Sequence, residues 1–262
     1  MGETPVSQKV IMMDHAPESA HFRRLEDHVF LAERGGPPPL NVGLILGEDA
    51  AVLIDPGPAG GDHTALLAAV RELSSAELIV VNTHGHPDHV GANDFLRRQG
   101  VHRILAHADA GVETATDLVA AEPVTLPLGG GVEVVLEHLG RGHTQGDLVV
   151  GVRAEGSTGV VFCGDLVREG DDPEFHDSYP KEWVRALGRL WSMAGSYSRF
   201  VPGHGHEVDA DFIASMRRRM QQGYNVSSQA IRESVNDATK AIPIVPYGPG
   251  ESRELITRLR GR

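Results

Sequence analysis

The chain has one cysteine, no long apolar run and fewer basic than acidic residues, and each shortage excludes a class of protein. Cys163 alone forms neither an internal disulfide framework nor a cysteine-rich zinc site. No apolar stretch approaches the roughly 18 residues of a membrane-spanning helix, and the N-terminus lacks the basic and apolar regions of a secretory signal. With 24 basic and 36 acidic residues the formal net charge is −12, which disfavours nucleic acid and anionic membrane as partners. We therefore expect a cytoplasmic protein.

Apolar runs separated by glycine- and proline-rich turns predict alternating strands and helices, with hairpins early in the chain. Hydrophobic residues make up 40% of the 262 residues, which is enough for a sizeable core. This order favours a mixed sheet covered by helices. Residues 108–120 are expected to form one of these helices. Pro243, Pro246 and Pro249 predict that regular structure ends before the C-terminus.

The most informative segment is residues 84–89, His-Gly-His-Pro-Asp-His, which directly follows an apolar run expected to be a strand. The first two histidines are two residues apart, so an extended backbone directs both to the same side. The proline fixes φ and can open a helix, so the next two side chains approach the same hollow from another direction. Imidazole and carboxylate without thiolate suit zinc, manganese or iron. The candidate ligands of these two adjacent half-sites are His84, His86, Asp88 and His89.

Three later segments place the same residue types where strands are expected to end. His143 lies in a glycine-bounded turn, Asp165 follows an apolar run, and His204 stands in the sequence Pro-Gly-His-Gly. The neighbouring glycines let the backbone approach closely. His206 competes with His204 for the role of last ligand, and the flanking glycines favour His204.

Together these residues closely resemble the metallo-β-lactamase superfamily over residues 22–208. The resemblance implies an α/β fold, a four-layer αββα sandwich of two mixed β-sheets flanked by helices, with a binuclear metal site at one edge of the sheets. Residues 22–208 would then be the catalytic domain. Residues 1–21 would form a loose arm, and residues 209–262 a helical tail packed on the same domain.

The resemblance also implies a role for each candidate residue. Two divalent metal ions are the expected cofactors, zinc first, with iron or manganese as alternatives. Asp55, in the turn Leu-Ile-Asp-Pro-Gly, would orient ligands, although it could also serve only as a turn former. Asp88 would also orient the nucleophile or accept its proton. The implied ligands are His84, His86 and His143 for one metal, Asp88, His89 and His204 for the other, and Asp165 as the bridge.

These residues permit hydrolysis by a metal-bridging hydroxide, and the expected partner is a small ester-like substrate: a thioester, a lactone or a related carbonyl compound. The β-lactamases of the superfamily place cysteine or serine where this chain has Asp165, which disfavours β-lactam hydrolysis. Asp165 instead resembles the bridging residue of thioester and lactone hydrolases, phosphodiesterases and persulfide dioxygenases. A mononuclear iron oxidoreductase of persulfides and a catalytically idle metal-binding member remain the alternatives.

Residues 168–181 follow Asp165 and are expected to overhang the site. Phe175, His176 and Tyr179 in this segment are the candidate substrate contacts. The stiff segment at residues 35–39, Gly-Gly-Pro-Pro-Pro, is expected to form the opposite wall.

Overall fold

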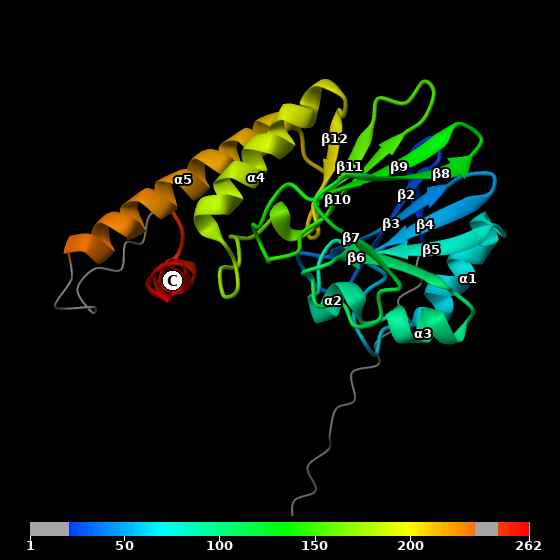
Figure 1. Cartoon of the computed structure of the whole chain (residues 1–262), viewed down its shortest axis with the longest axis horizontal. Coiled ribbons are helices and arrows are strands. Elements are labelled where there is room, and N and C mark those ends of the chain that lie inside the picture. The colour runs from blue at the N-terminus through cyan, green and yellow to red at the C-terminus, as the bar shows by residue number, and fades with distance from the viewer. Residues whose placement is uncertain (1–20, 234–245, 262) are drawn as a thin grey trace, which may run out of the picture.

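The computed structural model describes residues 21–233 and 246–261, and within them twelve strands form two sheets (Figure 1). Apart from residue 21, the expected arm at residues 1–21 lies outside the described residues, as does Pro243. None of the described helices is long and apolar enough to cross a membrane.

The first sheet has seven strands in chain order, antiparallel from β1 to β4 and parallel from β4 to β7. The second has five strands in the order β12-β11-β10-β9-β8, and only β11 and β12 run parallel. The strands of the first sheet are β1 (Arg23–Glu26), β2 (Val29–Arg34), β3 (Leu40–Leu46), β4 (Ala50–Ile54), β5 (Glu77–Val81), β6 (Arg103–His107) and β7 (Asp117–Val119). Those of the second are β8 (Val124–Gly129), β9 (Val132–Glu137), β10 (Val149–Arg153), β11 (Val160–Phe162) and β12 (Arg199–Val201).

Helices cover the outer face of each sheet. Side chains of α1 and α3 pack on the first sheet, and those of α4, α5 and α6 join a buried cluster with the second. In Figure 1, α4 and α5 lie side by side and extend beyond the sheets. The helices are α1 (His63–Leu73), α2 (Pro87–Val90), α3 (Asn93–Arg98), α4 (Pro180–Ser192), α5 (Ala210–Glu233) and α6 (Pro249–Arg260), with 3-10 turns at Gly164–Leu166 and Met193–Gly195.

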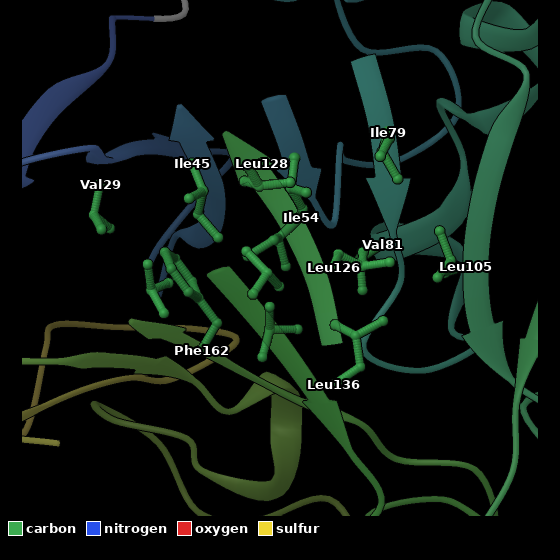
Figure 2. Close-up of a cluster of buried hydrophobic side chains, with 14 of the residues drawn as sticks. Val29, Ile45, Ile54, Ile79, Val81, Leu105, Leu126, Leu128, Leu136 and Phe162 are labelled. Atoms are coloured by element: carbon green, nitrogen blue, oxygen red, sulfur yellow. The ribbon is translucent and has the colours of Figure 1, made fainter. Parts of the chain in front are cut away.

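Strand periodicity explains why the two sheets stack. Successive side chains of a strand point to opposite faces, and the apolar strands supply both faces. On β4, Val52 and Ile54 face the second sheet, while Leu53 faces the helices. On β11, Phe162 faces the first sheet and Val161 faces the helices. Figure 2 shows the resulting layer of apolar side chains between the sheets. The αββα architecture is therefore confirmed.

Two local predictions are wrong. Residues 108–120 form no helix; turns lead into β7, which pairs parallel with β6 and buries Val119 in the core between the sheets. Gly111 within that segment has φ +69°, outside the helical range. Pro249 does not end regular structure but begins α6, because the first residue of a helix needs no donated N–H bond.

Candidate metal centre

The pairing of β4 with β5 positions the first part of the site. Ile54 lies opposite Val81 in this parallel pair, so the loops that follow both strands start at the same sheet edge. Asp55, with φ +50°, accepts bonds from the Thr83 N–H (2.8 Å) and the Thr83 hydroxyl (2.6 Å). Aspartate is one of the few residues that adopt this left-handed conformation readily. The loop that carries residues 84–89 is thus held on a buried carboxylate.

His84, His86 and His143 form the first group of converging side chains. One ring nitrogen from each lies within 4.8 Å of the others, and His143 Nε2 is 3.0 Å from His86 Nδ1. His143 comes from the loop between β9 and β10. There the buried Asp147 carboxylate accepts bonds from the Gly142 N–H, the Thr144 N–H and the Thr144 hydroxyl, which fixes the turn.

Asp88, His89 and His204 form the second group. Pro87 opens the short helix α2, which turns the chain as expected and carries Asp88 and His89. His204, from the loop after β12, lies 3.0 Å from Asp88 Oδ2 through Nε2. Potential ligand atoms of all three side chains lie within 4.8 Å of one another.

Asp165 lies between the two groups, in the 3-10 turn after β11. Its carboxylate oxygens are 3.7 Å from His143 Nε2, 3.4 Å from His89 Nε2 and 3.9 Å from His204 Nε2. The backbone of Gly203 packs against this carboxylate, and a Cβ at that position would collide with Asp165 Oδ1. Glycine at this position therefore lets the two strand ends approach.

The donor atoms fit a divalent metal centre. His84 Nε2, His89 Nε2 and Asp165 Oδ1 are buried without a hydrogen-bond partner among the described residues. His89 Nε2 and Asp165 Oδ1 face each other at 3.4 Å without forming a hydrogen bond of good geometry. Buried polar atoms are nearly always satisfied in folded proteins, so several unsatisfied ones in one hollow are what a metal-binding site would present. Imidazole nitrogens and carboxylate oxygens are ligand types that zinc, iron and manganese accept.

The opposite ring nitrogens are mostly held by oxygen atoms, which orients the rings. His89 Nδ1 lies 2.9 Å from Asp55 Oδ2, and His86 Nε2 lies 3.0 Å from Asp177 Oδ2. His84 Nδ1 contacts the Thr83 hydroxyl at 3.1 Å, and His204 Nδ1 contacts the Pro38 carbonyl at 3.3 Å. His143 is the exception, since its Nδ1 is buried and unpartnered within the described part of the chain.

Burial and charge move the pKa values of these groups in different directions. Burial lowers the pKa of His143 to about 4, and burial with neighbouring imidazoles holds the pKa of His84 well below its ordinary value. Burial also lowers the pKa of His89, but Asp55 and Asp165 outweigh it and raise that pKa well above the usual range. The neutral imidazoles of His84 and His143 are the form that binds metal.

Asp177 and Arg168 belong to the site although the sequence analysis did not single them out. Burial opposes ionisation of Asp177, but the bond to His86 outweighs it and lowers its pKa. Arg168 Nη1 lies 3.3 Å from Asp165 Oδ2 and 3.0 Å from Glu174 Oε1. Both residues lie in the segment expected to overhang the site, next to the positions chosen there.

The three candidate substrate contacts differ in position. Phe175 is fully buried between Trp183 and Tyr247 in the core beneath α4 and α6, so its ring offers no surface to a substrate, and that expectation is corrected. The exposed ring of His176 stacks on His86 at 5.3 Å. Tyr179 lines, with His86, a hollow of about 300 Å³. The structure thus brings two of the three next to the metal centre.

His204 and His206 differ clearly in their position relative to the metal centre. His204 converges with Asp88 and His89, whereas the His206 side chain is 83% exposed and bonds to Glu169. The expected opposite wall, residues 35–39, lies beside His204, since the Pro38 carbonyl contacts its ring.

Comparison with known proteins agrees with this geometry. A family model described as the metallo-β-lactamase superfamily matches residues 35–215. Since that is more than half of the chain, the protein belongs to this superfamily.

Similar proteins of known sequence include a hydroxyacylglutathione hydrolase from Chromohalobacter salexigens, 28% identical over 159 residues, or 61% of this chain and 58% of that protein. Metallo-β-lactamase domain-containing protein 1 from Xenopus laevis is 32% identical over 174 residues, 63% of this chain and 70% of that protein. The chain spans just over half the length of the hydroxyacylglutathione hydrolases that it matches.

Solved structures with the same fold include the DIM-1 metallo-β-lactamase, with a TM-score of 0.66 and 20% identity, covering 77% of this chain and 97% of that one. A metallo-β-lactamase from Pontibacter korlensis has a TM-score of 0.65 at 21% identity, covering 77% of this chain and 98% of that one. At such identities the likeness shows the fold alone.

Proposed function

We propose that this protein is a binuclear metal-dependent hydrolase of a small ester-like substrate, such as a thioester, a lactone or a related carbonyl compound. The observation that carries the proposal is the pair of three-residue groups with the Asp165 carboxylate between them, in which several buried ring and carboxylate atoms have no hydrogen-bond partner among the described residues. The resemblance to hydrolases of hydroxyacylglutathione, an acylated thiol, supports an ester-like bond as the target.

Each side chain then has a defined task. In this proposal His84, His86 and His143 hold one metal, Asp88, His89 and His204 hold the other, and Asp165 binds both. Once bound, the two metals supply Lewis-acid polarisation of the substrate carbonyl and a nucleophilic water of lowered pKa. Asp88 orients that nucleophile or accepts its proton. Asp55 and Asp177 orient the rings of His89 and His86 by contacting the ring nitrogen that is not assigned to a metal.

Residue type at the bridging position argues against β-lactams as the native substrate. The β-lactamases that this chain resembles place cysteine or serine at this position. Cys163 lies two residues before Asp165, but it is fully buried on the helix-facing side of the second sheet. A cysteine ligand would therefore require the backbone to move.

The direct test is elemental analysis of the purified protein, combined with a panel of an ester, a thioester, a lactone and a phosphodiester. We expect about two divalent metals per chain, as in two-metal hydrolytic sites, and turnover of at least one carbonyl substrate. One iron per chain with oxygen uptake on a persulfide would replace the proposal with an iron oxidoreductase. Full metal content without turnover on any substrate of the panel would indicate a catalytically idle member.

A further inference from the structure

Arg34, the last residue of β2, is a buried cation that pairs with no carboxylate in the described part of the chain. It is 4% exposed, and its Nε has no hydrogen-bond partner within residues 21–233 and 246–261. Its two Nη atoms lie 3.4 and 3.5 Å from the Asp62 carbonyl. Among the described residues no carboxylate pairs with it, whereas Arg168, also largely buried, pairs with Asp165 and Glu174.

An unpaired buried charge is costly, because the lost hydration is replaced by no protein partner. The guanidinium of arginine presents five N–H donors and no acceptor, so it is satisfied only by acceptor groups. A guanidinium in this state is therefore poised for an anion. Its planar fork of N–H donors matches a carboxylate in two parallel hydrogen bonds.

Two glycines in the loop after β4 leave room for this guanidinium. A Cβ at Gly61 would lie 3.1 Å from Arg34 Nη2, and one at Gly57 would lie 3.8 Å from Nε. Gly57 also has φ +107°, a conformation that favours glycine. Because only 4% of Arg34 is exposed, surrounding atoms hold the cation in place before any ligand binds, which reduces the entropy lost on binding.

Arg34 lines the same hollow as two residues of the metal centre. The hollow measures about 150 Å³, and its lining includes Asp88 and His204 together with the apolar Pro38 and Leu40. A space of this size takes a carboxylate with a short carbon chain. A group bound to Arg34 would therefore lie beside the second half of the metal centre.

We propose that Arg34 binds a carboxylate of the substrate, so that the substrate is an ester, thioester or lactone that also carries a free carboxylate a few bonds from the reacting carbonyl. This inference rests on the proposed hydrolase function. Arg34 acts here as a specificity-determining residue, and Pro38 and Leu40 enclose the linking carbons.

Binding is tested on the metal-loaded protein by titration calorimetry, with glutarate as the probe and glutaramide as its uncharged analogue. We expect the wild type to bind glutarate more tightly, and R34M to weaken glutarate binding on the order of 10- to 100-fold, the loss expected for a hydrogen-bonded charge pair. R97M, which removes an exposed arginine on α3, is the control and should bind glutarate as the wild type does. Equal affinity of wild type and R34M for glutarate would overturn the proposal.

The kinetic test uses the mono-4-nitrophenyl ester of glutaric acid and the same compound capped as a methyl ester. We expect the ratio of kcat/KM for the acidic over the capped substrate to fall on the order of 10-fold or more in R34M, to fall less in R34K, and to stay constant in R97M. An unchanged ratio in R34M contradicts the inference. If the wild type hydrolyses neither compound, the hydrolase proposal fails for these esters, whereas the glutarate titration still decides whether Arg34 binds carboxylates.

Discussion

The layer between the two sheets is buried and the metal centre is largely so, yet they are built from opposite kinds of side chain. The layer consists of apolar side chains such as Ile54, Leu136 and Phe162, which pack against one another (Figure 2). The centre, at the ends of the same strands, gathers imidazoles and carboxylates, and some of their buried atoms have no hydrogen-bond partner in the described part of the chain. The layer therefore stabilises the protein by itself, whereas the shape of the centre depends on the strand ends that carry its side chains.

This contrast predicts that changes in the centre remove metal and activity without unfolding the protein. Asp165→Ala, or His84→Ala, should strip metal and abolish turnover while the circular dichroism spectrum stays that of the wild type. The reason is that each removed group faces the hollow rather than the core between the sheets. Metal content by elemental analysis and rates on the preferred ester measure the effect. Retained turnover in either variant contradicts the ligand assignment.

The layer should behave in the opposite way. Leu136→Ala leaves a cavity between the sheets and should lower the free energy of unfolding by about 2–5 kcal/mol, with metal content unchanged. Denaturant unfolding of the metal-loaded protein measures this loss. The matched control is Leu118→Ala on β7, where the side chain is 64% exposed and a small effect is expected. If Leu136→Ala lost metal as readily as Asp165→Ala, the layer and the centre would not contribute separately to stability and metal binding.

Asp55 connects the two regions, since it directly follows the core strand β4 and its carboxylate contacts the ring of His89 in the centre. Asp55→Asn should weaken metal binding by about 10- to 100-fold, the usual cost of removing a carboxylate that orients a ligand histidine. Competition with a chromophoric chelator measures this affinity. The control is Asp62→Asn at the exposed start of α1. If Asp55→Asn bound metal with unchanged affinity, Asp55 would serve only as a turn former.

Asp147 is buried but lies behind the metal centre, and burial raises its pKa to about 7 from an ordinary value of 3.8. A carboxyl group whose pKa is raised in the folded protein contributes to stability at pH values below its pKa in the unfolded chain. This contribution is lost as the pH rises to about 7. The stability advantage of wild type over Asp147→Asn should thus be larger at pH 5 than at pH 8, by on the order of 2 kcal/mol. Urea unfolding of both proteins in chelator at the two pH values tests this. If the stability advantage of the wild type over Asp147→Asn grew with pH instead, the pKa of Asp147 would not be raised in the folded protein.

His206 should give the smallest effect. Its exposed ring contacts Glu169 rather than the centre, so His206→Ala should keep both metal content and turnover. His204→Ala, the paired variant, should lose the metal held with Asp88 and His89. A large loss in His206→Ala alone would exchange the roles of the two histidines.

The sequence predicted the parts of the molecule that depend on local patterns and on family likeness. Residues 84–89 carried their ligand types and spacing in one short run, and the turn at Pro87 formed as expected. The helix expected at residues 108–120 does not form, because the pairing of β7 with β6 outweighs the local preference for a helix. Phe175 was misjudged because an aromatic in an overhanging loop faces either the site or the core, and only packing against Trp183 and Tyr247 decides.

By itself the sequence determined the ligand types, their order and the period-two apolar strands, because these are properties of neighbouring residues. Only the tertiary structure decided which distant groups meet: Asp177 behind His86, and Arg34 in the hollow beside Asp88 and His204. Arg34 and His204 are far apart in the sequence, and the β2–β3 hairpin and the β12 loop bring them together at one sheet edge. Long-range proximity of this kind follows from strand pairing and backbone packing, which a local pattern of residues does not encode.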